Sequence, residues 1–167
     1  MTEKRDILLV KSSGSGADDA HLYWLFSKSQ LEMVLRDIVV QSAPAPMSLA
    51  QGVVNWQDEA LPLVSLESYY GMAKRAVAQP TRYLFIKGAA RVAGEVRLAM
   101  IVVPISAEMR MGALDIAGTP IAPLPLKENG TDIHGTYALA DGGVAVVPDV
   151  WRIACRCREE GQAGTRP

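Results

Sequence analysis

Cys155 and Cys157 are the residues of this sequence best suited to metal binding or redox chemistry. A structural zinc site uses four ligands, and the histidines, His21 and His134, lie far from both cysteines in the sequence. A metal or redox sensor built on the two thiols is therefore a secondary hypothesis, and a structural role is the primary interpretation. We expect no metal ion and no cofactor.

The segment after Lys11 combines serines with glycines, as phosphate-binding loops do. A P-loop, however, places its lysine after the glycines and opens a helix. Here the lysine comes first, and Asp18 and Asp19 add negative charge. Phosphate binding is therefore not expected, and the sequence also lacks the Gly-x-Ser-x-Gly motif of an activated serine.

His134 lies near Asp132 and Asp141 in the sequence, which would allow an acid–base pair. A histidine next to a glycine at the start of a strand is more often a turn residue. The adjacent carboxylates Asp58 and Glu59 suit the solvated tip of a hairpin better than acid–base catalysis. We therefore predict no catalytic residues and no enzymatic activity.

The composition is that of an ordinary globular protein. The chain has 167 residues, near the size of one domain or of two small ones that share a core, with 49% hydrophobic and 21% charged residues. The formal net charge of −1 comes from 17 basic and 18 acidic side chains, and nothing indicates the concentrated basic surface that nucleic-acid binding needs. No stretch reaches the roughly 18 apolar residues of a membrane span, and no signal peptide is visible. We expect a cytoplasmic protein that is not inserted in a membrane.

Short apolar runs separated by turn residues predict a mainly β protein. One segment departs from this β pattern. Its apolar residues have helical spacing, at Leu31, Val34, Leu35 and Ile38, and Ser27 before them is a possible cap. This spacing predicts one short helix in the first part of the chain. Strand candidates cover residues 7–10, 22–26, 83–86, 92–103, 137–139 and 144–147, and residues 109–116 are either a strand or a loop.

Residues 52–66 are the most distinctive segment of the sequence. An apolar run, a polar turn at residues 55–59 and a second apolar run predict a β-hairpin, bounded by Pro44 and Pro46 on one side and Gly71 on the other. The number of strand candidates is too large for one small barrel. We therefore predict an all-β protein with two lobes, and take residues 73–81 as the passage between them.

The chain resembles the CheW-like domain, the adaptor module of bacterial chemotaxis arrays. The resemblance is carried by Pro-Ala-Pro at 44–46, Gly-Val-Val-Asn-Trp-Gln-Asp at 52–58 and Leu-Pro-Leu-Val-Ser-Leu at 61–66. The later segments follow in the order of the family, at residues 83–86, 96–103, 120–125 and 135–150. The resemblance covers residues 6–154, and each motif alone is less specific than the order of all of them.

This resemblance implies two five-stranded β-barrels of the Src-homology-3-like kind, packed together as one domain over residues 6–154. The boundary between the barrels is expected near residues 73–81, and residues 155–167 are expected to be a flexible tail. The family is not enzymatic. By resemblance, one barrel contacts the regulatory domain of a chemotaxis histidine kinase, and a groove between the barrels holds the cytoplasmic tip of a methyl-accepting receptor in a membrane array. The partner-binding residues implied are Gly52, Val54, Asn55, Trp56, Gln57, Leu61, Pro62 and Leu63.

Several positions depart from the family pattern and indicate a divergent or accessory member. Gln57 stands where the family usually has an arginine, whose charge and planar fork a glutamine cannot reproduce. Trp56 replaces a small aliphatic residue, Ser65 replaces an aspartate, and Pro104 follows Val103 where the family has Val-Asp. An alternative function is a small-molecule sensor on the same barrels, with Trp56 and the methionines lining a pocket.

Overall fold

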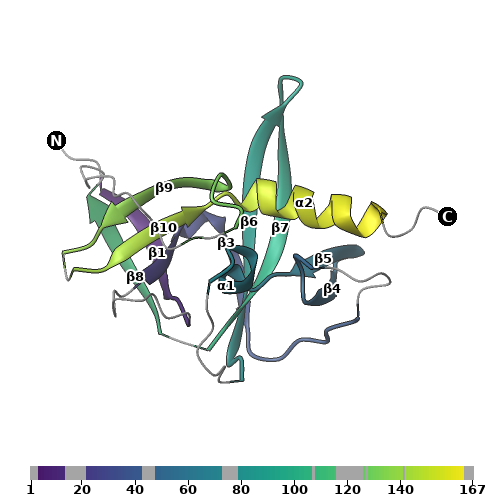
Figure 1. Cartoon of the computed structure of the whole chain (residues 1–167), viewed down its shortest axis with the longest axis horizontal. Coiled ribbons are helices and arrows are strands. Elements are labelled where there is room, and N and C mark those ends of the chain that lie inside the picture. The colour runs from purple at the N-terminus through teal and green to yellow at the C-terminus, as the bar shows by residue number, and fades with distance from the viewer. Residues whose placement is uncertain are drawn as a thin grey trace.

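The computed structural model describes residues 4–13, 22–42, 48–72, 79–106, 108–115, 126, 128–140 and 142–163. They form two five-stranded sheets and one long helix, which crosses the second sheet (Figure 1). The prediction of an all-β protein built from two five-stranded units is confirmed. The segments 44–46 and 120–125, which carry part of the resemblance, lie outside the described residues.

The first sheet joins the two ends of the chain in the order β8-β1-β2-β10-β9. Its strands are β1 (Lys4–Lys11), β2 (Leu22–Ser27), β8 (Met109–Asp115), β9 (Ile133–Ala138) and β10 (Val144–Pro148). All neighbours are antiparallel except β2 and β10, which are parallel. The strand candidates at residues 137–139 and 144–147 are confirmed as the antiparallel β9–β10 pair.

The second sheet uses the middle of the chain in the order β3-β6-β7-β5-β4. Its strands are β3 (Leu31–Leu35), β4 (Gly52–Trp56), β5 (Glu59–Leu63), β6 (Arg82–Val92) and β7 (Glu95–Ile105). The parallel pair here is β5 with β7, which share the register pair of Leu63 with Val102. A short helix, α1 (Leu66–Tyr69), follows β5.

The predicted passage between the two units, near residues 73–81, is wrong. That connector follows β5 and α1 and precedes β6, and both strands belong to the second sheet. The chain instead enters the second sheet between β2 and β3 and leaves it between β7 and β8. The whole second sheet is thus an insertion between the two parts of the first.

Both sheets are buried on two faces. One face of each sheet contributes to a shared core, and the other face packs in a separate cluster. Along β1, Leu8 and Val10 belong to the shared cluster, while Ile7 and Leu9 belong to a separate cluster on the other face. The second sheet alternates in the same way, with Leu84 and Ile86 in the shared cluster and Phe85 in a third one. A strand with a period of two can serve two cores at once.

The helix predicted over residues 31–38 is absent, and Leu31–Leu35 form β3. The capping signal is real but produces a single 3-10 turn, Lys28–Gln30, in which the Ser27 amide donates to Gln30 Oε1 at 2.9 Å. Pairing of β3 with β6 outweighs the helical spacing, because tertiary contacts routinely override weak local preferences.

The expected flexible tail is also wrong over much of its length. Residues from 155 onward continue helix α2 (Val150–Ala163), whose buried positions Val150, Ile153, Ala154 and Cys157 have helical spacing and join the shared core. Most residues after position 157 are polar and exposed, so their sequence does not show that the helix continues there.

Candidate protein-binding surface

The β4–β5 hairpin predicted from the sequence is present, with Gly52 opposite Leu63 and Trp56 opposite Glu59. Gln57 and Asp58 form its two-residue turn, with φ angles of 47° and 63°. Two successive positive φ angles are those of a type I′ turn, which usually uses Asn-Gly. The turn here uses two residues with a Cβ atom, and both are exposed at the tip.

Strand alternation divides the predicted partner-binding residues into a buried and an exposed group. Val54, Leu61 and Leu63 are buried in the core of the second sheet. Trp56 is half-buried against Phe85, with ring centroids 5.3 Å apart. These side chains hold the hairpin on its sheet and have little surface to offer a partner.

Gly52 fixes the path of the chain into the hairpin. A Cβ atom at this position would lie 2.7 Å from Val40 Cγ1 and 2.9 Å from the carbonyl oxygen of Gln41. Gln41 in turn exchanges backbone hydrogen bonds of 2.8 and 2.9 Å with Val53. Glycine therefore lets the incoming segment pair with β4.

Asn55, Gln57 and Pro62 are the predicted residues that remain at the surface. Asn55 and Gln57 are exposed, and Pro62 is half-buried. The Asn55 side chain is oriented by a hydrogen bond from Nδ2 to Gln41 Oε1 at 3.1 Å. The exposed edge of the hairpin is thus held in one geometry before any partner arrives.

A groove of about 620 Å³ separates this hairpin from helix α2. The hairpin contributes one face of its paired strands, where Val53 lies opposite Pro62 and Asn55 opposite Ala60. The far wall comes from β7 and from the later turns of the helix, through Leu98, Ala99, Met100, Ala154, Cys157, Arg158, Gly161 and Gln162. Its lining mixes apolar and polar groups, as protein-binding surfaces do.

The small-molecule pocket predicted from the sequence, lined by Trp56 and the methionines, differs from this groove. Among the residues that the structure describes, Trp56 does not line the groove and Met100 is the one methionine that does. Met33 and Met72 instead pack with the hydrophobic cores. The described lining of this groove therefore does not match a ligand pocket built from Trp56 and several methionines.

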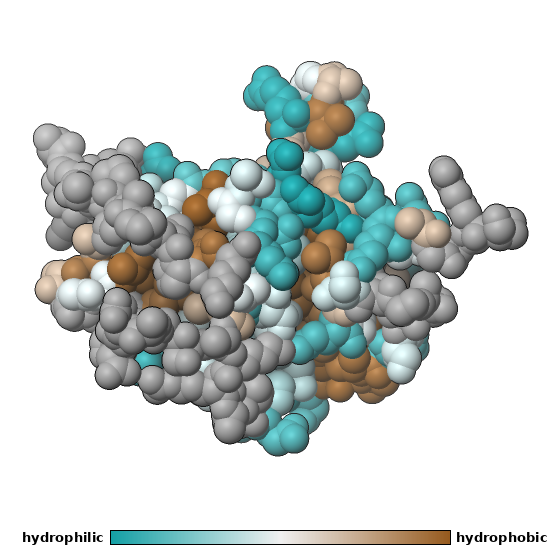
Figure 2. Space-filling view, viewed as in Figure 1, coloured by the Kyte–Doolittle hydropathy of each residue, from teal (hydrophilic) through white to brown (hydrophobic). Residues whose placement is uncertain are grey.

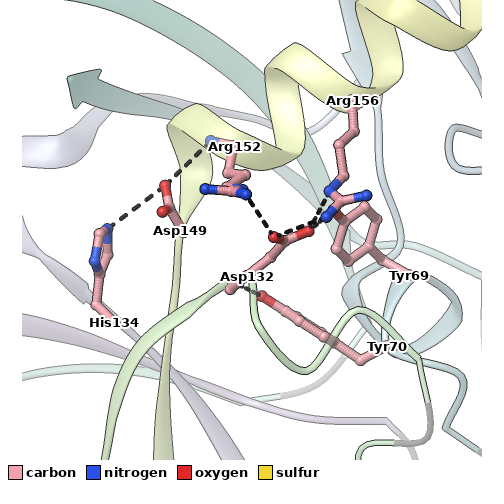
Figure 3. Close-up of polar contacts among 7 residues, drawn as sticks. All are labelled: Tyr69, Tyr70, Asp132, His134, Asp149, Arg152 and Arg156. Carbon is pink, nitrogen blue, oxygen red and sulfur yellow. Dashed lines mark hydrogen bonds and ion pairs between the residues drawn. The ribbon is translucent and has the colours of Figure 1, made fainter. Parts of the chain in front are cut away.

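Helix α2 is anchored at its start by the buried carboxylate of Asp132 (Figure 3). Arg156 Nε lies 2.6 Å from Oδ2 and Arg152 Nε 3.2 Å from Oδ1 of this aspartate. The Tyr69 hydroxyl donates to Oδ2 at 2.5 Å, and the Tyr70 hydroxyl donates to the Asp132 carbonyl oxygen at 2.7 Å. Burial and the neighbouring carboxylate raise the pKa of Tyr69 well above its usual value, so this hydroxyl stays a donor.

Two further contacts hold the helix along its length. Gly88 of β6 allows close approach, because a Cβ atom there would lie only 2.3 Å from the Trp151 amide nitrogen. Near the other end, Glu160 accepts hydrogen bonds from the Ser48 and Leu49 amides. Burial raises the pKa of Glu160, but the hydrogen bonds from Ser48 and Leu49 outweigh it and leave the pKa below its usual value. The wall of the groove is therefore fixed to both sheets and to the segment before β4.

The residues considered for chemistry are not brought together. His134 Nε2 lies 3.5 Å from Asp149, not from Asp132, and Asp141 lies outside the described residues. Cys157 is buried, and burial raises its pKa to about 12. In the described part of the chain, no group of three or more histidine, cysteine or acidic residues could hold a metal ion. The same part contains no helix long and apolar enough to cross a membrane.

Sequence reasoning missed the helical half of the groove. The signal was available, because Val150, Ile153, Ala154 and Cys157 follow the i, i+3, i+4, i+7 pattern of a packed helix face. Asp149 adds a cap, since its Oδ1 accepts from the Arg152 amide at 3.1 Å. No sequence pattern indicates that β7 lines the groove, because its place there depends on the order of the strands in the second sheet.

Comparisons with known proteins agree with this architecture. The family model described as the CheW-like domain matches residues 30–156. A search of the curated proteins gives no match. Among solved structures, the fold is similar to that of the scaffolding protein TtCheW from Thermoanaerobacter tengcongensis, with a TM-score of 0.60 and 12% identity over 87% of this chain and 89% of that one. Because the family model matches well over half of the sequence, the chain belongs to the CheW-like domain family, whose members are non-catalytic scaffolds of chemotaxis signalling.

Proposed function

We propose that this chain is a cytoplasmic adaptor that couples the tip of a methyl-accepting receptor to the regulatory domain of a chemotaxis histidine kinase. The observation that supports this most directly is the β4–β5 hairpin, whose buried side chains fix it on the second sheet while Asn55, Gln57 and Pro62 stay at the surface. The groove between this hairpin and α2 supplies an adjoining concave surface. Recruitment to a membrane receptor array would then occur through these protein contacts alone.

The geometry suits binding without a large change of shape. The tip is held by a two-residue turn, Asn55 by Gln41 and the opposite wall by the Asp132 ion pairs. A partner segment would therefore spend little of its binding free energy on ordering this surface. The interface lacks a charged anchor at position 57, so affinity for a standard partner should be lower than an arginine there would give.

The first prediction concerns the role of position 57 in partner binding, and its test restores the charge that the family pattern usually carries there. Gln57→Arg should strengthen binding to the kinase regulatory domain or to the receptor tip, by about 5- to 50-fold if the arginine meets a carboxylate. Gln51→Arg is the matched control, because Gln51 is also exposed and lies just before the same strand. Isothermal titration calorimetry against purified partners from the same genome measures both.

Equal affinities for Q57R, Q51R and the unmodified chain would remove the hairpin tip from the interface. Absence of binding by all three proteins, to every kinase regulatory domain and receptor tip tested, would reject the coupling function itself. Circular dichroism of each variant shows whether the fold is retained.

A further inference from the structure

The β6–β7 hairpin extends beyond the sheet that carries it and projects past helix α2 (Figure 1). Its two strands pair with each other along their whole length. Among the described residues, β3 pairs with β6 no further than Ile86, and β5 pairs with β7 at Val102. Residues 88–101, called the finger from here on, thus form a two-stranded unit, and no other strand of the described part of the chain pairs with its outer edges.

The β7 edge of the finger carries exposed apolar side chains. Val96 is 64% exposed and Leu98 is 67% exposed, and both point to the same face because strand residues alternate. Glu95 and Arg97 point to the opposite face and are also exposed. Figure 2 shows an apolar spot among polar side chains at the projecting tip. An open strand edge with apolar side chains is a template for another strand, and a lone two-stranded hairpin is only marginally stable.

The backbone of this edge has hydrogen-bonding groups to offer. The finger ends in the two-residue turn Ala93-Gly94, with φ angles of 51° and 82°. In such a hairpin the flanking residues, here Val92 and Glu95, bond to each other. The pattern then alternates, so the amide and carbonyl groups of Val96 and Leu98 point away from β6.

We propose that two copies of this chain associate through this edge, with β7 antiparallel to β7 about a two-fold axis at Val96. The sequence of the edge is complementary to itself in that register. Glu95 of each copy lies opposite Arg97 of the other, which gives two opposite-charge pairs, and Val96 lies opposite Val96. An interface of this kind is isologous and closes at two copies.

Neighbouring registers are worse for identifiable reasons. A two-fold axis at Arg97 sets two arginines directly opposite each other, which is destabilising. An axis at Leu98 brings Gly94 of one copy opposite Val102 of the other, and Val102 already pairs with Leu63 of β5. The axis at Val96 avoids both conflicts, because its pairing ends at Leu98, short of the β5 contact.

The expected association is weak and depends on concentration. The paired segment is short, and interfaces that bury less than about 1,200 Å² are typical of transient complexes. This inference is independent of the proposed coupling to a receptor and a kinase, since it needs no partner other than a second copy. Its test therefore uses the chain alone.

Charge reversal at the two edge positions tests the register. E95K alone and R97E alone each place like charges opposite each other twice, so each variant should stay monomeric at concentrations where the unmodified chain dimerises. An equimolar mixture of E95K and R97E restores both opposite-charge pairs and should recover the dimer. Sedimentation equilibrium from about 10 μM to 1 mM, at low and at high salt, measures the unmodified chain, each variant and their mixture.

Arg91→Glu is the matched control, because Arg91 lies on the finger but on β6, away from the paired edge. It should leave the dimerisation constant within about twofold of the unmodified chain. A monomer at every concentration would overturn the proposal, and so would a dimer that all the single variants retain. A mixture that stays monomeric would overturn the register. Oxidative cross-linking of V96C, but not of V92C, would support the axis independently, because directly opposed Cα atoms about 5.5 Å apart allow a disulfide.

Discussion

At the scale of single residues, buried polar groups hold the surface in place. Glu67 is buried and accepts hydrogen bonds from Ser12 Oγ at 3.2 Å and from Trp24 Nε1 at 3.1 Å, which ties β1, β2 and α1 together. Ser65, where the family pattern has an aspartate, still caps α1 by accepting from the Ser68 amide at 3.3 Å. Neither role was predicted from the sequence, because both depend on residues brought together by the fold.

Asp132 is the residue whose loss should affect α2 most. Asp132→Asn removes the charge that faces Arg152 and Arg156 and should lower the free energy of unfolding by about 2–3 kcal/mol. The loss should stay below the 3–5 kcal/mol typical of a fully buried pair, because Arg152 and Arg156 are 59% and 38% exposed and can turn to water. Urea denaturation at pH 7 measures the change.

Asp149→Asn is the control for this prediction, because asparagine caps a helix about as well as aspartate does. It makes the same chemical change at the residue that caps α2 and should alter stability by less than about 0.5 kcal/mol. Equal losses for the two variants would mean that Asp132 acts through general charge near the helix start and not through its ion pairs.

The partner-binding residues predicted from the sequence lie on both faces of the β4–β5 hairpin. Eight residues between positions 52 and 63 are predicted to bind a partner, yet Val54 and Leu63 are buried, whereas Asn55 and Pro62 line the groove. The period of two in a strand could have separated these sets from the sequence. The orientation of the hairpin toward α2 could not be predicted from the sequence, because the helix follows the hairpin by nearly 90 residues along the chain.

At the scale of elements, the strands were easier to predict than the helices. Apolar runs and turn residues located the β4–β5 and β9–β10 hairpins, whose signals are local. Residues 31–38 carried a helical spacing and a capping pair, but the segment became the edge strand β3 because β6 offered a partner. Helix α2 was missed because a narrow apolar stripe is hard to recognise next to a polar chain end.

The fit of α2 on the second sheet should depend on Gly88. Gly88→Ala places a Cβ atom 2.3 Å from the Trp151 amide nitrogen, so the helix must shift. Overpacking of this kind costs about 1–3 kcal/mol, and the loss should appear as a lower urea midpoint with a reduced helical signal at 222 nm. Gly112→Ala in β8 is the matched control, since nothing lies within 4 Å of its Cβ position. A G88A protein as stable as G112A would show that α2 can shift on the second sheet without loss of stability.

At the scale of the whole molecule, the number of units was predictable but their connectivity was not. Counting strands gave two lobes, because one small barrel cannot use so many. The sequence then suggested a simple succession, with a passage near residues 73–81. The fold instead closes the first sheet with strands from both chain ends, through the parallel pairing of β2 with β10. Such long-range pairing leaves no local mark in the sequence.

This connectivity predicts that the molecule unfolds as one unit. The fragment of residues 28–106 would contain every strand of the second sheet, yet Leu84, Ile86, Ile101 and Val103 on its shared face would face water without the first sheet and α2. Exposing such side chains costs about 1.5–3 kcal/mol each, which is a large share of the stability of a small domain. Native-state hydrogen exchange with mass spectrometry should therefore give the same opening free energy for core peptides from β2, β6 and α2 as denaturant rises. If peptides from β6 stayed protected after those from β2 had exchanged, the inserted sheet would be an independent unit, and the shared core would contribute less than its burial indicates.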